Sequence, residues 1–328
     1  MSNLLFSINA VLPIVLTVLL GYTIKRIGLI PVSATPVMNR LVFRVFLPAM
    51  LFLNIYKIQS IADIELGYVA YVLGFTCLIF LFTIPVSMLI TKDGKQRGPI
   101  VQGAFRSNFA LVGIPLATSL FGEEGGIVAS VLSAFIVPLL NVLAVISLSI
   151  FNKERSEKPS AGGILLGIVK NPLIQSIALA VACLGVRAIF EQTGVTFRLS
   201  DLTPLYSTLT SLSAVATPLA LVTLGAQFEF SAVASLKKQI LWVVLARGLL
   251  IPVLSLSLAY ALNCFKGAHF AAFVATFTTP VAVSSVPMAQ EMGSDSILAG
   301  QLVVWTTVVS GFSIFLATLA LKSIGVFG

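Results

Sequence analysis

Residues 106–115 read RSNFALVGIP, and residues 278–287 read TTPVAVSSVP. Both are apolar stretches interrupted by proline, and Pro115 and Pro287 lie 172 residues apart. A helix that is broken inside lipid leaves backbone N–H and C=O groups without partners, which is tolerated only within protein or beside a water-filled cavity. Two such breaks at matching places in two halves of a chain are typical of the substrate site of a secondary transporter.

The composition is that of a protein embedded in a membrane. Of its 328 residues, 58% are hydrophobic and only 10% are charged, whereas about a quarter of a soluble domain is charged. The mean hydropathy is +1.05. The net charge of +8 is spread over short loops and forms no basic stripe of the kind that binds nucleic acid. We therefore expect membrane lipid, and no nucleic acid, around the chain.

Ten apolar stretches are long enough for a helix to cross the hydrocarbon layer, which takes roughly 20 residues. They lie near residues 4–24, 37–56, 66–91, 99–121, 125–151, 163–190, 202–228, 235–263, 268–290 and 297–321. The polar stretch 152–161 divides them into two sets, so we expect one five-helix repeat over 1–151 and a second over 162–328. Because five crossings is an odd number, the second repeat must run inverted relative to the first. The sequence predicts an all-α integral membrane protein with ten transmembrane helices, of which the fourth and ninth are broken.

Positive residues indicate how such a chain is oriented, because they concentrate on the cytoplasmic side. With the N-terminus outside, thirteen basic residues flank the inner side and five the outer side. The inner residues are Lys25, Arg26, Arg40, Arg44, Lys92, Lys95, Arg97, Lys153, Arg155, Lys158, Lys170, Lys237 and Lys238. We therefore expect a multi-pass protein of the inner cell membrane, with both termini outside and the linker 152–161 in the cytoplasm.

The second half of each broken helix would begin near the middle of the membrane. Its free N–H groups and partial positive charge favour an anionic group there. The predicted substrate-binding residues surround the two breaks and are Arg106, Ser107, Asn108, Gly113, Pro115, Thr279, Pro280, Ser284 and Ser285. The alternative is a pair of proline kinks with a structural role alone.

Several polar side chains inside the predicted spans have two possible roles. Arg106 contacts an anion or gates its path, or else it extends toward the inner surface along its aliphatic stem. Arg247 contacts the anion or braces a neighbouring helix end. Asn54, Asn141 and Gln227 either line a pathway or form hydrogen bonds between helices.

No Asp or Glu lies in the middle of a predicted span, which argues against a carboxylate proton relay. Coupling, if present, would use Na⁺ held by backbone carbonyls with Asn, Ser or Thr, or a proton carried with the substrate. We expect Glu291 and Asp295 to be solvated turn or helix-cap charges. His269 is the only histidine and the three cysteines are far apart, so we expect neither a metal nor another cofactor.

Two motifs resemble those of a known family. Asn108 followed by Gly113-Ile114-Pro115, and then Phe121-Gly122-Glu123, resembles the first crossover of the auxin efflux carriers. Pro280, followed by Ala289-Gln290-Glu291-Met292-Gly293, is similar to the second crossover. The resemblance covers the whole chain, although Ser285 and Pro287 depart from the pattern of the family.

The resemblance implies a fold like that of the bile-acid symporters. Spans one, two, six and seven would form a scaffold through which two copies dimerise. The other six spans would form a transport domain that moves against the scaffold in an elevator-type mechanism. The substrate site would lie where the fourth and ninth spans cross, with Asn108 as a contact.

These observations predict a secondary transporter of small organic anions, either monocarboxylates or dicarboxylates similar to malate and malonate. The alternative is a cation/proton exchanger of related fold, which the missing carboxylates disfavour. A membrane-embedded enzyme is a third hypothesis. No HExxH, GxSxG or paired-aspartate motif lies within a predicted span, so we expect no enzymatic activity.

Overall fold

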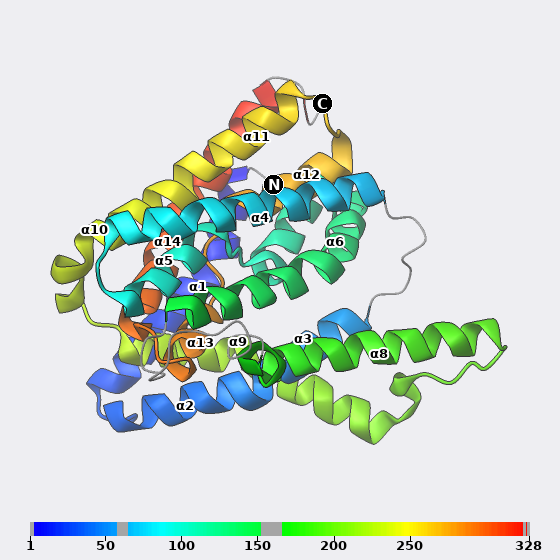
Figure 1. The fold of residues 1–328 in the computed structure, drawn as a ribbon, viewed down its shortest axis with the longest axis horizontal. Coiled ribbons are helices and arrows are strands. Elements are labelled where there is room, and N and C mark those ends of the chain that lie inside the picture. Colours follow the sequence, from blue (N-terminus) through cyan, green and yellow to red (C-terminus); the bar gives the residue numbers. More distant parts are fainter. Residues whose placement is uncertain (1–2, 58–64, 152–165, 324–325, 327–328) are drawn as a thin grey trace.

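The computed structural model describes residues 3–57, 65–151, 166–323 and 326. Within these residues the chain is helical, and the one β-type contact is an antiparallel bridge between Ser107 and Val281. Seven of the described helical segments are long and apolar enough to cross a membrane. They are Thr35–Tyr56, Leu66–Ile90, Phe109–Phe151, Pro172–Gln192, Thr203–Gln227, Ser231–Ala261 and Ser296–Leu321. The chain is therefore an all-α multi-pass membrane protein (Figure 1).

The helices of the first half are α1 (Asn3–Arg26), α2 (Thr35–Leu41), α3 (Leu47–Tyr56), α4 (Leu66–Ile90), α5 (Gly94–Phe105) and α6 (Ile114–Phe151). Those of the second half are α8 (Pro172–Gln192), α9 (Thr203–Gln227), α10 (Ser231–Leu245), α11 (Ile251–Ala261), α12 (Gly267–Thr278), α13 (Ser285–Glu291) and α14 (Ser296–Ser323). Short 3₁₀ turns lie at Val32–Ala34 and Leu199–Asp201. The linker 152–161 lies outside the described residues, so the division into two repeats stays a prediction.

Three π-helical turns are inserted at Val42–Phe46, Phe109–Gly113 and Ala246–Leu250, and we call them η2, η3 and η5. Each is followed after one residue by a proline, namely Pro48, Pro115 and Pro252. A proline inside a helix has no N–H to donate, and its ring clashes with the carbonyl one turn earlier. A π turn widens the helix at that place. The chain thus continues as a helix through all three prolines.

The first helix break was therefore wrongly predicted at Pro115. The first break covers 106–108, since α5 ends at Phe105 and η3 begins at Phe109. The second covers 279–284, and Pro287 lies in the first turn of α13, where its missing N–H has no intrahelical partner to lose.

A further interruption separates the fourth and fifth predicted spans within α6. Phe121 and Gly122 have non-helical backbone angles, and Gly122 has φ 63° and ψ −154°. A side chain other than glycine would be strained there, because positive φ brings a Cβ atom close to the backbone. The helix is thus interrupted where the sequence predicts one span to end, near residue 121, and the next to begin, near 125. That the two sides form separate spans stays a prediction.

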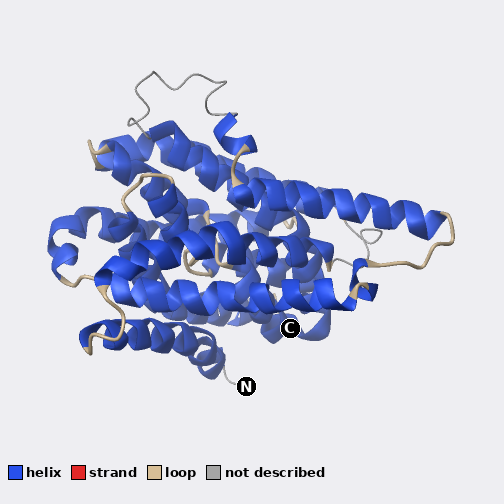
Figure 2. Ribbon diagram, turned by 90° about the horizontal axis from the view of Figure 1, so that it is seen from below, coloured by secondary structure: helices blue, strands red, loops and turns tan. Residues whose placement is uncertain are grey.

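The helices lie in two groups. Helices α2, α3, α8 and α9 form a layer below the others in Figure 1, and Figure 2 shows them from below. Helix α3 packs on α8 and α9, and α1 packs on α9 and α14. In the other group, α4, α5, α6, α10 and α12–α14 pack on one another.

Helix α12 lies in the middle of the second group. From Phe270 to Thr278 all of its residues are buried, and it contacts α6 over much of its length. Its aromatic side chains interlock with α4, as in the edge-to-face pair of Phe75 and Phe277 at 5.3 Å. A helix that is apolar on every side is a core helix, which is why this short segment needs no exposed face.

Candidate functional site

The two breaks cross each other and satisfy each other's backbone groups. The N–H of Asn108 donates to the carbonyl of Pro280 at 2.8 Å, and the N–H of Ala282 donates to the carbonyl of Arg106 at 3.2 Å. These two bonds make up the Ser107–Val281 bridge. Non-helical backbone within a membrane protein has to be paired by protein in this way. The breaks are therefore a built crossing and not a pair of kinks.

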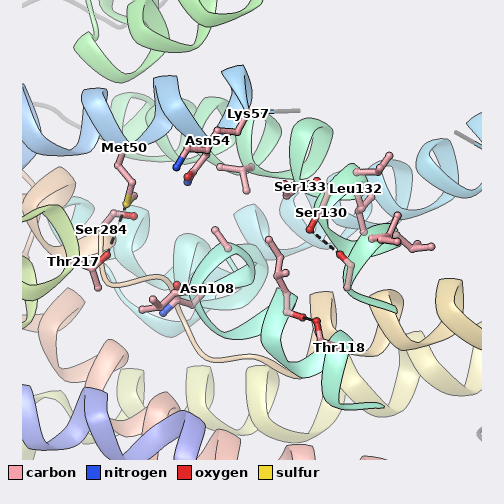
Figure 3. A pocket seen from close by; sticks show the side chains of 18 of the residues that line it. Met50, Asn54, Lys57, Asn108, Thr118, Ser130, Leu132, Ser133, Thr217 and Ser284 are labelled. Atoms are coloured by element: carbon pink, nitrogen blue, oxygen red, sulfur yellow. Dashed lines mark hydrogen bonds between the residues drawn. The ribbon is translucent and has the colours of Figure 1, made fainter. Parts of the chain in front are cut away.

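A cavity of about 980 Å³ ends at this crossing. Asn108 and Ser284 line its deep end, and Figure 3 shows Asn54 of α3, with Lys57 just after that helix, on the opposite wall from Asn108. Near the other end of the cavity lie residues that begin or follow helices, namely Lys57, Glu65, Glu123 and His269. The side chain of Glu65 is 68% exposed, which identifies this end as the open one.

Most of the cavity wall is apolar, with a small number of polar groups placed along it. Apolar walls with few polar contacts are typical of sites for small organic molecules. The uncharged residues of the wall with a hydroxyl or amide group are Asn54, Tyr68, Asn108, Thr118, Ser130, Ser133, Thr217 and Ser284. The cavity thus has room and chemistry for an organic solute with a small polar head.

Asn108 has an unused hydrogen-bond donor. The residue is 8% exposed, and its Nδ2 atom is buried without a hydrogen-bond partner in the described part of the chain. A buried donor that lacks a partner costs on the order of 1–3 kcal/mol. Because that atom has almost no exposed surface, the amide of Asn108 has to turn toward the cavity before an acceptor atom on a bound molecule can remove that cost.

Arg106 lies directly behind the wall and is 1% exposed. Its guanidinium donates to Oε1 of Gln102 at 2.8 Å and to Oδ1 of Asn141 at 2.9 Å. It also donates to the hydroxyls of Ser284 at 2.9 Å and Ser285 at 3.2 Å. All four acceptors are neutral, and no carboxylate within the described ranges forms a salt bridge with it. Among the described residues, the charge of Arg106 is therefore bound by neutral side chains and paired with no carboxylate.

Ser284 connects this charge to the cavity. Its hydroxyl oxygen accepts from Arg106 and the residue lines the cavity, so its hydroxyl hydrogen is left to donate to an occupant. Helix α13, which follows, has only seven residues, or about two turns, so its dipole is small. The positive potential at the deep end thus comes from Arg106, whereas the sequence pattern suggested a helix N-terminus.

The structure brings together some of the nine residues that the sequence singled out. Asn108 and Ser284 line the cavity, whereas Arg106, Ser107 and Ser285 are buried behind its wall. Thr279 donates its hydroxyl to its own helix, at Ala275 O, 3.0 Å away, and Pro280 is buried in the second break. Gly113 is buried against Phe109, and Pro115 is exposed on the outside of α6.

The four other polar residues noted in the spans have separate positions. Asn54 lines the cavity, and Asn141 holds Arg106. Gln227 donates to Gln290 in the last turn of α13. Arg247 faces away from the cavity, because its three hydrogen bonds go to backbone carbonyls at helix ends. Of its two expected roles, bracing helix ends is the one observed.

Sequence reasoning missed the wall residues on the other helices. Thr217 on α9, Met50 on α3 and Ser130 on α6 line the cavity. None of them belongs to a motif or breaks an apolar stretch, and single hydroxyl residues are common in membrane helices. Only the packing of these helices around the crossing identifies them.

At the end opposite the open mouth, α2 and α9 hold the end of α13. Asn39 and Gln227 both donate to Oε1 of Gln290, at 2.6 and 3.2 Å, and Gln290 donates to the carbonyl of Pro36 at 3.2 Å. These contacts join the layer of α2 and α9 to the C-terminal end of α13. They close the molecule at this end.

Two ion pairs reinforce this closure. Glu291 pairs with Arg40 at 3.4 Å and with Arg44 at 3.3 Å. Its side chain is 8% exposed, against 61% and 65% for the two arginines. The expectation of a solvated charge is therefore wrong for Glu291, because α2 covers it. Asp295 is the helix-cap charge that the sequence predicts, because its carboxylate accepts from the N–H of Leu298 in α14 at 2.8 Å.

We call the group formed by Asn39, Arg40, Arg44, Gln227, Gln290 and Glu291 the latch. Its members come from α2, η2 and α9 on one side and from α13 on the other. The latch and the cavity therefore lie at opposite ends of α13, since Ser284 precedes its first residue and Glu291 is its last.

Comparisons with known proteins agree with this arrangement. A family model described as "Membrane transport protein" matches residues 6–318. An uncharacterized transporter of Methanothermobacter thermautotrophicus is 24% identical over 306 residues, which are 93% of this chain and 95% of that protein. An uncharacterized transporter of Methanocaldococcus jannaschii is 29% identical over 121 residues, 36% of this chain and 39% of that protein. The resemblance to the auxin efflux carriers is thus confirmed, and the chain belongs to the membrane transport protein family.

Proposed function

We propose that this transporter moves small organic anions, with one or two carboxylates, across the cell membrane by alternating access. The observation that carries the proposal is the buried charge of Arg106, which reaches the deep end of the cavity through Ser284. An anion there would accept from Ser284 and Asn108 while lying close to a buried cation. Hydrogen bonds to charged groups contribute about 1.5–3 kcal/mol each.

The same charge disfavours a cation/proton exchanger, which was the alternative. A cation at the deep end would be repelled by Arg106, since the low dielectric of the interior strengthens charge interactions. Among the described wall residues only Glu65 and Glu123 are acidic, and both belong to the open end, away from the crossing. In the part of the chain that the structure describes, the deep end of the cavity therefore supplies donors for an anion and no carboxylate for a cation.

Alternating access is supported by the asymmetry of the molecule. The cavity is open at the end of Glu65, while the latch closes the other end at Glu291. The latch residues belong to two different helix groups, so moving one group against the other would open it. We therefore propose that α1–α3, α8 and α9 form a scaffold, and that the remaining helices form a transport domain that moves in an elevator-type mechanism.

We further propose the ten-span inverted repeat that the sequence predicts. In this scheme α5 with 109–121 is the fourth span, 123–151 is the fifth, and α12 with α13 is the ninth. The charge distribution supports an orientation with both termini outside and the linker in the cytoplasm, so that the cavity faces outward. Dimerisation through the scaffold follows from the resemblance to the auxin efflux carriers.

Counterflow in proteoliposomes tests the function. Purified protein is reconstituted with unlabelled carboxylate inside, and the uptake of labelled carboxylate is followed for a panel of mono- and dicarboxylates. Wild type should accumulate at least one of them, and Asn108→Ala should reduce that rate at least about tenfold, the loss expected for about 1.4 kcal/mol.

Ser130→Ala is the matched control for this experiment. Ser130 lines the same cavity, but its hydroxyl donates to the carbonyl of Gly126 at 2.7 Å and lies on another helix. Its removal should leave counterflow close to wild type. The proposal fails if no carboxylate exchanges, and the site assignment fails if Asn108→Ala exchanges as fast as Ser130→Ala.

A further inference from the structure

Arg247 has a set of partners unlike that of Arg106. It lies in η5, is 1% exposed, and donates to the carbonyls of Thr279 at 2.8 Å, Thr276 at 3.0 Å and Ala104 at 3.1 Å. Ala104 lies in the last turn of α5, and Thr276 and Thr279 lie at the end of α12. One guanidinium thus joins the C-terminal ends of both interrupted helices.

The positive charge of Arg247 is balanced without an acidic residue. The C-terminal end of a helix carries roughly half a negative elementary charge. Helices α5 and α12 have 12 residues each and end side by side on Arg247, so together they supply about one negative charge. Arg247 supplies one positive charge, and no carboxylate in the described ranges forms a salt bridge with it. The guanidinium is therefore held as a counter-ion of two helix ends.

Carbonyl groups at the ends of broken helices are the groups that bind free coupling cations in many transporters. Here the same kind of carbonyl group binds the guanidinium of a side chain, Arg247. We propose that the carbonyls of Ala104, Thr276 and Thr279 form a cation-binding site whose resident cation is Arg247, and that Arg247 is the positioning residue of the crossing. A chain without this side chain would bind a free guanidinium ion in its place.

The carbonyl site around Arg247 lies next to the residues by which the two breaks are hydrogen-bonded to each other. Thr279 is followed by Pro280, whose carbonyl accepts the N–H of Asn108 at 2.8 Å. Arg247 holds the carbonyl of Thr279 in place. It therefore also positions the adjoining residue, Pro280, to which the N–H of Asn108 is hydrogen-bonded. It acts on the substrate site through this backbone and does not touch the cavity.

Chemical rescue of Arg247→Ala tests the proposal. The melting temperature of the purified variant is measured with millimolar guanidinium, and with choline, Na⁺ or urea at the same concentration. We expect the variant to melt several degrees below wild type, and guanidinium to restore most of that loss while choline and urea restore none. Na⁺ should give at most a partial rise, because it lacks the planar donors that match three carbonyls.

Arg198→Ala is the control, since the Arg198 side chain is 52% exposed and pairs with Glu191 on the surface. Neither this variant nor wild type should respond to guanidinium. A rise of equal size with guanidinium and choline, or no rise with guanidinium, would overturn the proposal.

A second pair of variants decides the matter if Arg247→Ala does not fold. Arg247→Lys keeps the positive charge, and Arg247→Met has similar length without it. We expect the lysine variant to melt well above the methionine variant and to exchange substrate. A methionine variant as stable as the lysine variant would show that the carbonyls need no cation.

Discussion

At the residue scale, Arg106 and Arg247 are two buried cations with opposite tasks. Arg247 is balanced by two helix ends and holds the backbone of the crossing. Arg106 is bound only by neutral side chains, so its charge remains available to a molecule in the cavity. Buried charges in membrane proteins are costly and rare, and each of these two has a distinct reason to be there.

The charge of Arg106 should set the preference for an acid over its amide. A carboxylate and the matching carboxamide have nearly the same shape and differ in charge. Wild type should bind the acid at least about tenfold more tightly, a difference of about 1.4 kcal/mol. Arg106→Gln should bring the two dissociation constants together, and Arg106→Lys should keep much of the preference. Competition against labelled substrate measures both constants.

Two outcomes would contradict this role. Arg106→Gln could retain the full preference for the acid, in which case another group supplies the positive potential. Wild type could bind acid and amide equally well, in which case the cavity recognises shape alone. Ser284→Ala should fall between wild type and Arg106→Gln, because it removes the hydroxyl that connects Arg106 to the cavity.

The sequence predicted part of this site. Asn108 and Arg106 stood out because polar and charged residues are unusual in an apolar stretch that contains a break. Ser284 and Ser285 could not be separated, since the turn before α13 decides that one hydroxyl lines the cavity and the other does not. Thr217 could not be found at all, because α9 comes from a distant part of the chain.

At the element scale, the prolines do not mark the residues at which the helices are interrupted. Pro115 indicated a break, but a π turn over Phe109–Gly113 absorbs the missing N–H and the ring, and the helix continues. The true break at 106–108 contains no proline. It is stabilised by bonds to residues 280 and 282, which lie far away in the sequence. The sequence pattern therefore identified the segment in which the helix is interrupted. The exact residues of the interruption, 106–108, are decided by their hydrogen bonds to the second break.

Helices α1 and α9 meet so closely that only glycine fits at the contact. A Cβ atom on Gly225 would lie 1.9 Å from the carbonyl oxygen of Val18 in α1. Gly225→Ala should therefore force the helices apart and cost about 1–3 kcal/mol, the usual range for overpacking. The melting temperature of the purified protein should fall accordingly.

Gly185→Ala is the matched control in α8. A Cβ atom at Gly185 would meet nothing within 4 Å, so the change should be neutral or slightly stabilising. If Gly225→Ala melts at the same temperature as Gly185→Ala, the two helices do not pack as closely as the structure has them.

At the scale of the whole molecule, the cavity and the latch together correspond to one state of the alternating-access mechanism that we propose. The cavity is open near Glu65, and at the other end Glu291 forms ion pairs with Arg40 and Arg44. Hydropathy alone predicted the membrane class and most helix boundaries, because each span must be apolar over its own length. It could not predict the latch, since Asn39 and Gln290 are 251 residues apart and meet only after both helix groups have packed.

Cross-linking the latch tests alternating access most directly. Asn39→Cys and Gln290→Cys are combined in a variant whose three cysteines are replaced by alanine, and are joined by a short, cleavable bifunctional thiol reagent. We expect the cross-linked protein still to bind carboxylate, because the cavity stays open, and no longer to perform counterflow. Cleaving the linker should restore exchange, and the single-cysteine variants should transport throughout. Counterflow by the cross-linked protein at the rate of the untreated double variant would contradict the proposal that the latch opens during transport. Substrate would then cross the membrane with the latch held shut.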